Sequence, residues 1–183
     1  MDATHDAILR DSLTNQYNEM SKVLDDLPHL QMVYPSLTFN EHLTIHGSKR
    51  DVELHCFGGG HTSSDLFLYI PDDNIAFMGD IVTDGIHLPI FDPEAFISIL
   101  AKVRQINIDT IVPGHGEIGT LSLAETLTEY LSNIIKQVKK AHDHNKTFDE
   151  FTATFSLPDQ FKNWKGINGI KRNLTTVYSF YKS

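Results

Sequence analysis

The sequence predicts an α/β fold, in which strands and helices alternate along the chain. Three runs, VELHCF, IAFM and DTIV, are each short enough for a buried strand, and each is followed by Gly or Pro-Gly. Longer segments around these runs carry apolar residues at three- and four-residue spacing, which is the helical period. Strands interleaved with helices are typical of a sheet that helices cover.

The first half of the chain predicts one helix followed by four strands. The helix is expected over about residues 7–24, where the apolar positions are Leu9, Leu13, Tyr17, Met20 and Leu24. Residues 37–58 predict two short strands joined by a turn at 47–49. The next two strands, LFLYI and IAFM, flank the sequence PDDN at 71–74, and these residue types favour a hairpin turn.

The second half predicts four helices and one strand. Asp92 followed by Pro93 is a typical helix start, because the carboxylate caps free N–H groups and proline suits the first turn. This helix is expected to end near Ile106. After the strand DTIV and the loop PGHG, a long helix is expected to bury Leu127, Tyr130, Leu131, Ile134, Ile135 and Val138. Two more helices close the chain, and the last is expected to bury Ile167, Ile170, Leu174, Val177, Tyr178 and Tyr181.

Composition indicates an ordinary globular protein. With 183 residues, of which 40% are apolar, a single domain over 1–183 is expected. The net charge of −9 disfavours nucleic acid or an anionic membrane as a partner, since both are bound through clustered Lys and Arg. No apolar run approaches the length of a membrane span and the polar start MDATHDAILRDS is unlike a signal peptide, so a cytoplasmic location is expected. Cys56 is the only cysteine, which excludes an intrachain disulfide.

Three short segments each place a metal-ligand residue where a strand is expected to end. They are GGGHTSSD with His61, FMGD with Asp80, and IVPGHGE with His115. Strand ends meet at one edge of a sheet, so residues that are remote in the sequence can converge there, and glycine lets the backbone turn sharply. Imidazole nitrogen and carboxylate oxygen without a thiolate suit zinc, with iron or manganese as alternatives. The sequence therefore predicts a metal site formed by these three residues.

Neighbouring residues have simpler interpretations. Asp65 is expected to orient His61 or to cap its loop, because metal-bound histidines need an outer acceptor. His87 is expected at the surface, with contact to a substrate as the alternative. His61 as a turn residue and Asp80 as the cap of a strand end are the structural alternatives to metal binding.

The order G-G-H-T-x-x-D, then apolar-G-D, then P-G-H-G resembles the second half of the metallo-β-lactamase superfamily of hydrolases, over about Leu37 to Leu131. The resemblance implies part of a four-layer αββα sandwich. It also implies that His61 binds one metal ion, that Asp80 bridges two ions and that His115 binds the other. The helices from about residue 120 to 183 resemble an extension of that domain.

The family's opening motif, H-x-H-x-D-H, is absent from these 183 residues. The one H-x-H sequence, His142-Asp143-His144, lies far downstream and is interpreted as a helix end. We therefore expect an N-terminally truncated domain that binds metal weakly or as a single ion.

Two functions remain open on sequence grounds. The resemblance implies a metal-dependent hydrolase of a small-molecule ester, thioester, lactone or lactam, with activity impaired by the missing motif. The alternative is a non-catalytic module that pairs with itself or with a separate N-terminal half. Whether the chain is an active enzyme is left open by its residues.

Overall fold

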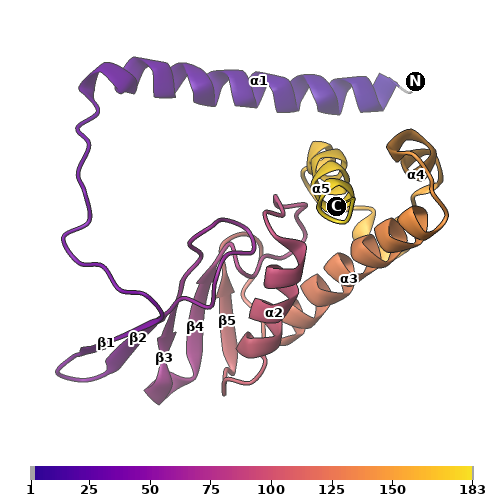
Figure 1. Cartoon of the computed structure of the whole chain (residues 1–183). Coiled ribbons are helices and arrows are strands. Elements are labelled where there is room, and N and C mark those ends of the chain that lie inside the picture. Colours follow the sequence, from indigo (N-terminus) through magenta and orange to yellow (C-terminus); the bar gives the residue numbers. More distant parts are fainter. Residues whose placement is uncertain (1–2, 183) are drawn as a thin grey trace. The chain divides into compact units, whose positions relative to one another are not determined.

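The computed structural model describes residues 3–182. The chain is divided into two compact units, and the boundary between them lies between Thr38 and Phe39. The first unit contains helix α1 (Ala3–Asp26), the short turn η1 (Leu27–His29) and an irregular segment (Figure 1). The helix predicted over 7–24 is confirmed and is longer at both ends. Its apolar side chains at 13, 17, 20 and 24 are exposed, so they form no core within this unit, and the side chain of Leu9 lies outside the described residues.

The second unit is built on a five-stranded sheet with the order β1-β2-β3-β4-β5 (Figure 1). The strands are β1 (His42–His46), β2 (Asp51–His55), β3 (Phe67–Ile70), β4 (Ile75–Gly79) and β5 (Thr110–Pro113). The first four form antiparallel pairs, whereas β5 pairs with β4 in parallel. All five predicted strands are confirmed. The parallel pair brings the carboxyl ends of β4 and β5 to the same edge of the sheet.

One face of the sheet forms the hydrophobic core. Its buried side chains come from alternate positions of β3, β4 and β5: Phe67, Tyr69, Ala76, Met78 and Ile111. They belong to one cluster with residues of helix α2 (Pro93–Val103), namely Phe96, Ile99, Leu100 and Val103. Helix α2 forms the crossover between the parallel strands and so anchors both strand ends that carry the predicted ligands.

The opposite face is apolar across all five strands. Successive cross-strand partners form the row Leu43, Leu54, Leu68, Phe77 and Val112. The second row contains the partners Ile45 and Val52 and the partners Ile70 and Ile75. We call these nine residues the apolar sheet face. Phe77 is 44% exposed and Ile45 is 50% exposed, so part of this face lies open to solvent.

Helices α3 (Ser122–Asp143), α4 (Phe148–Thr154) and α5 (Ile167–Phe180) complete the second unit. Helix α2 begins as predicted, with an Asp92 carboxylate oxygen accepting the N–H groups of Glu94 and Ala95 at 3.0 and 2.9 Å. It ends at Val103, three residues before the predicted end. The long helix and the two closing helices are confirmed, although the side chain of Ile167 lies outside the described residues.

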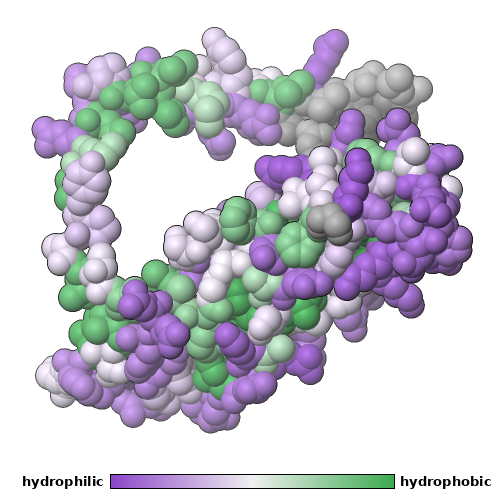
Figure 2. Space-filling view, in the orientation of Figure 1, coloured by the Kyte–Doolittle hydropathy of each residue, from purple (hydrophilic) through white to green (hydrophobic). Residues whose placement is uncertain are grey.

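Helix α3 is amphipathic, with its apolar side turned to the core and its polar side outward. The buried residues are Ala124, Leu127, Tyr130, Leu131, Ile134, Val138 and Ala141. Hydrophilic side chains gather over α3 and α4 in the space-filling view (Figure 2). Within residues 3–182, no helix combines the length and apolarity needed to cross a membrane.

His87 is buried, and its expected place at the surface was wrong. The side chain is 4% exposed, and its Nδ1 lies 3.0 Å from the hydroxyl of Tyr130. Asn173, which is fully buried, donates to the same hydroxyl at 3.3 Å and to the Leu88 carbonyl at 2.8 Å. This network joins the segment after Asp80 to α3 and α5. Burial lowers the pKa of His87 and raises the pKa of Tyr130 to about 12.

The buried imidazole gives the second unit a pH-dependent stability. An unfolded histidine titrates near pH 6.5, and the pKa of His87 is lower in the folded state. Its contribution to stability is therefore complete above about pH 6.5 and is lost as the pH falls, because protons bind the unfolded chain more tightly.

We predict that His87→Gln reduces the loss of stability between pH 7 and pH 5.5 by up to about 1 kcal/mol. Glutamine keeps a polar partner for Tyr130 but does not titrate. Urea unfolding of both proteins across this range measures the difference. Parallel stability curves for the two proteins would show that His87 is not the titrating group.

Candidate metal site

The loops after β4 and β5 place Asp80 and His115 side by side. Gly79 has a positive φ of 50°, which turns the chain directly before Asp80. Gly114 donates its N–H to the Gly79 carbonyl at 2.7 Å. A Cβ at Gly114 would overlap the Asp80 carboxylate and would lie 2.6 Å from the Gly79 carbonyl carbon, so only glycine permits this approach. The glycine conformations of these two loops thus hold Asp80 and His115 at one edge of the sheet.

Asp65 organises the loop that carries His61. Its carboxylate, only 8% exposed, accepts the N–H groups of Gly60, His61 and Thr62 at 2.9, 2.7 and 2.9 Å. It also accepts the Thr62 hydroxyl. The prediction that Asp65 caps this loop is confirmed. The same loop is tied to the start of α2, because the Gly60 carbonyl accepts the N–H groups of Phe91 and Asp92 at 2.8 and 3.2 Å.

Gly60 lies directly against helix α2. A Cβ at this position would be 2.6 Å from Cγ and 2.8 Å from Cα of Phe96. Such separations are far inside van der Waals contact, so a larger residue would push the loop away from the helix. The position of His61 relative to the sheet therefore depends on this close packing.

The structure places both predicted histidine ligands beside Asp80, although the three residues do not each offer a ligand atom within 4.8 Å of the other two. His61 Nε2 lies 3.4 Å from Oδ2 of Asp80, and His115 Nε2 lies 3.5 Å from Oδ1 of the same carboxylate. The side chain of His61 is 14% exposed, that of Asp80 35% and that of His115 53%. One edge of the site is thus enclosed by protein while the other faces solvent.

The hydrogen bond between His61 and Pro89 determines which ring nitrogen faces Asp80. His61 Nδ1 lies 2.7 Å from the Pro89 carbonyl, which can only accept, so Nδ1 carries a proton. In the neutral ring, Nε2 then presents a lone pair toward the carboxylate of Asp80. Two lone pairs facing each other are stabilised by a bound cation or by a second proton on the ring. The Pro89 carbonyl could not be predicted from the sequence as the partner of His61, because every residue has a backbone carbonyl.

The separations also fit a shared metal ligand. Both exceed the usual 2.7–3.2 Å of a hydrogen bond. Metal–nitrogen and metal–oxygen bonds of about 2.1 Å at a tetrahedral angle put the two ligand atoms about 3.4 Å apart. Each imidazole faces its own oxygen of Asp80, so the arrangement suits two ions joined by one carboxylate better than a single ion held by all three residues. The role of His61, Asp80 and His115 as metal ligands stays a prediction.

Both histidines of the H-x-H sequence at the end of α3 have structural partners. His142 Nε2 lies 3.0 Å from the Tyr178 carbonyl, and its ring packs on the Tyr178 ring with centroids 4.3 Å apart. His144 Nδ1 lies 2.7 Å from the Lys140 carbonyl, directly after the last turn of the helix. The interpretation of this sequence as a helix end is confirmed.

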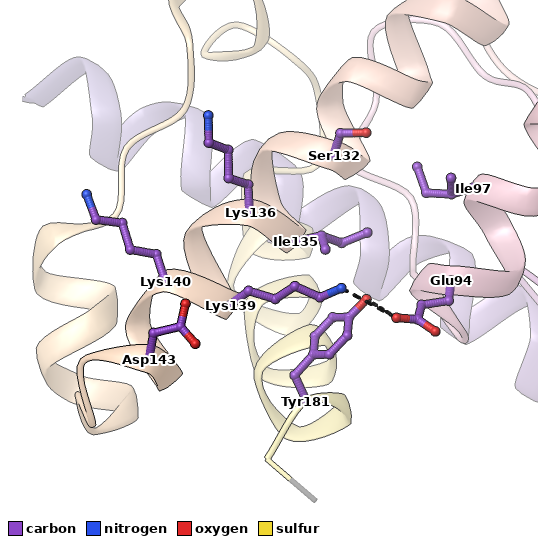
Figure 3. A pocket seen from close by; sticks show the side chains of 9 residues that line it. All are labelled: Glu94, Ile97, Ser132, Ile135, Lys136, Lys139, Lys140, Asp143 and Tyr181. Carbon is purple, nitrogen blue, oxygen red and sulfur yellow. Dashed lines mark hydrogen bonds and ion pairs between the residues drawn. The ribbon is translucent and has the colours of Figure 1, made fainter.

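A separate hollow of about 630 Å³ lies between α2, α3 and α5 (Figure 3). Tyr181 donates its hydroxyl to Glu94 at 2.9 Å across it, and Lys139 forms an ion pair with Glu94 at 3.6 Å. Burial and the neighbouring carboxylate of Glu94 raise the pKa of Tyr181. None of the three predicted metal ligands lines this hollow, so it is not part of the candidate site.

Candidate ligand residues on loops at one edge of a helix-covered sheet are typical of metal-dependent hydrolase domains. The family model described as the metallo-beta-lactamase superfamily matches residues 4–115, which include all three residues. The chain belongs to the metallo-beta-lactamase superfamily.

Two curated relatives are similar to part of this chain. One is a metallo-beta-lactamase type 2 of Bacteroides fragilis, 26% identical over 113 residues, which are 58% of this chain and 45% of that protein. The other is a beta-lactamase-like protein 2 homolog of Caenorhabditis elegans, 24% identical over 51% of this chain and 32% of that protein. The chain therefore spans less than half the length of these relatives.

Solved structures show the same fold. A metallo-beta-lactamase from Pontibacter korlensis is 27% identical and matches with a TM-score of 0.50 over 54% of this chain and 49% of that chain. A sec-alkylsulfatase from Pseudomonas sp. is 16% identical and matches with a TM-score of 0.61 over 83% of this chain and 27% of that chain. The second match extends beyond what residues 4–115 can account for and so includes part of the C-terminal helices.

We predict that Gly114→Ala destabilises the second unit by about 1–3 kcal/mol, because the added methyl group must displace Asp80 or the backbone of Gly79. Gly119→Ala is the matched control, since its Cβ would meet the end of the flexible Leu123 side chain at 2.9 Å. Urea unfolding compares the two variants. Equal stabilities would show that the approach of Gly114 to Asp80 is not a constraint.

Proposed function

We propose that this chain provides one half of the metal centre of a metal-dependent hydrolase. In this proposal His61 would hold one ion, His115 would hold a second ion and Asp80 would be a ligand of both. The observation that carries it is the position of the Asp80 carboxylate, whose two oxygens lie 3.4 and 3.5 Å from the Nε2 atoms of two different histidines. Zinc suits this donor set best, and iron or manganese are alternatives.

Bound divalent cations would lower the pKa of a coordinated water to near 7 and so supply hydroxide for attack on a carbonyl carbon. The chain's own residues would position that chemistry. The Pro89 carbonyl holds His61 in the tautomer whose Nε2 can bind metal. Asp65 keeps the loop of His61 rigid by accepting three of its N–H groups. We propose a small-molecule ester, thioester, lactone or lactam as the substrate.

The ligand count supports a requirement for further protein ligands. Each ion would receive one imidazole and one carboxylate oxygen from this chain, whereas zinc sites have about four ligands with three from protein in catalytic centres. The H-x-H-x-D-H motif is absent from these residues. We therefore propose that full activity needs ligands from another polypeptide segment and that these 183 residues alone bind metal weakly.

The apolar sheet face supports a partner that brings those ligands. Nine apolar side chains cover this face, and a surface of that kind favours association when it is open to solvent. In the αββα sandwich a second sheet packs there. We propose a complementing N-terminal half as the partner, with a second copy of this chain as the alternative.

A non-catalytic interaction module is the second candidate function. The same apolar sheet face favours it, because pairing through that face requires no metal ion. The two functions differ in one respect: the hydrolase requires His61, Asp80 and His115, whereas the module does not.

We predict that the purified chain carries zinc or iron, and that His61→Ala and His115→Ala each lower the metal content. Asp80→Asn should lower the metal content at both proposed ion positions, beside His61 and beside His115, because the amide has no negative charge to share between two ions. Elemental mass spectrometry after equilibrium dialysis against a fixed concentration of zinc measures this, and circular dichroism verifies that each variant is folded. Metal content unchanged in all three variants would overturn the proposed centre.

Activity is tested with the chain alone and in the presence of a peptide or protein that supplies the H-x-H-x-D-H motif. We expect hydrolysis of model esters, thioesters, lactones or lactams only in the second case, and its loss in Asp80→Asn. Association without hydrolysis, unchanged by Asp80→Asn, would favour the interaction module.

We predict that Phe77→Lys weakens self-association or binding to the complementing half, since it places a charge in the middle of the apolar sheet face. Phe91→Lys is the matched control, because Phe91 is also an exposed phenylalanine, 59% accessible, but lies outside that face. Light scattering on a size-exclusion column gives the masses. A wild-type protein that stays monomeric with every partner would remove the interaction.

A further inference from the structure

His42, Glu53 and His55 form a cluster on the first two strands, away from the three residues of the candidate site. His42 and His55 are direct cross-strand partners, and their ring centroids lie 4.7 Å apart. Glu53 is two residues from His55 on the same strand and therefore lies on the same face. Its Oε2 is 2.8 Å from His55 Nε2 and 3.7 Å from His42 Nε2.

We propose that His42, Glu53 and His55 bind a divalent transition-metal ion of the zinc class. One ligand atom from each residue lies within 4.8 Å of the other two, and within the described part of the chain this is the only such group of three. Two imidazoles and a glutamate are a donor set that zinc accepts, with one position left for water. The small inward movement of Glu53 needed to equalise its two distances is available to a flexible side chain.

The surroundings hold the cluster in place. The His55 ring stacks on Phe67 at 5.1 Å with an interplanar angle of 16°, and it also lies 5.6 Å from the ring of Phe57. Its side chain is 16% exposed, and that of Glu53 is 28% exposed. The His55 side chain is thus already ordered by packing, which lowers the entropy lost on binding an ion.

The open side of the cluster has room for a further ligand. A hollow of about 560 Å³ is lined by His42 and His55 and by Lys102 from α2. An ion held by the cluster would face this hollow with its remaining coordination position.

This site would be independent of the proposed hydrolase centre. It uses none of the residues His61, Asp80 and His115, and all three of its ligands come from one hairpin of this chain. Metal binding at this site therefore does not depend on a partner that supplies the H-x-H-x-D-H motif to the proposed hydrolase centre.

The test uses the full chain with His61→Ala and His115→Ala, which removes the other proposed ligands. Zinc chloride is titrated into this double variant by calorimetry, and cobalt(II) absorption reports the coordination. We expect one equivalent of zinc. Adding His42→Ala or Glu53→Gln should weaken binding by at least about 100-fold, because changes to mere outer-shell partners already cost about 10–100-fold.

His46→Ala is the matched control. His46 lies on the same strand as His42 and has its own carboxylate partner, Asp51, at 2.8 Å. We expect zinc binding to be unchanged in this variant, and thermal unfolding in a chelator verifies that all variants fold alike. No zinc bound by the double variant would overturn the site, as would binding that survives His42→Ala and Glu53→Gln. Either failure leaves the metal content of the His61, Asp80 and His115 centre to be measured separately.

Discussion

The carboxylate of Asp80 is the constraint on which the candidate centre depends, since it alone faces both imidazoles. Its place is set by the parallel pairing of β4 with β5 and by the absence of a side chain at Gly114. Backbone geometry rather than side-chain packing thus determines the distance between two residues that are 35 positions apart in the sequence. Helix α2 supports the arrangement, because it connects the two strands and packs on their buried side.

Much of this could be predicted from the sequence. The alternation of short and long apolar segments predicted every strand and α-helix of the second unit. The strand ends and glycines next to His61, Asp80 and His115 predicted that these residues lie at one edge of the sheet. Features that depend on three-dimensional packing could not be predicted. The burial of His87 depends on Tyr130 and Asn173, which are 43 and 86 residues away, and the pairing of His42 with His55 depends on strand register.

The proposed need for further metal ligands and the apolar sheet face point to the same requirement. A sheet whose two faces are both apolar needs a layer on each, and the helices of the second unit cover one of them. The proposed metal centre at the edge of that sheet would likewise need ligands beyond His61, Asp80 and His115. A single added layer of structure would satisfy both requirements, because it would cover the apolar side chains and bring ligands to the same edge.

The contact between Gly60 and Phe96 has a consequence for how such sequences diverge. The ring and backbone of Phe96 occupy the space where a side chain at position 60 would lie, so neither position can change freely on its own. Because the Cα of Phe96 would lie 2.8 Å from a Cβ at position 60, a smaller residue at 96 would leave a cavity under the loop without making room for a side chain at 60. Among relatives with this loop and helix, position 60 should therefore be glycine, and a larger residue there would mark a chain whose histidine loop has moved.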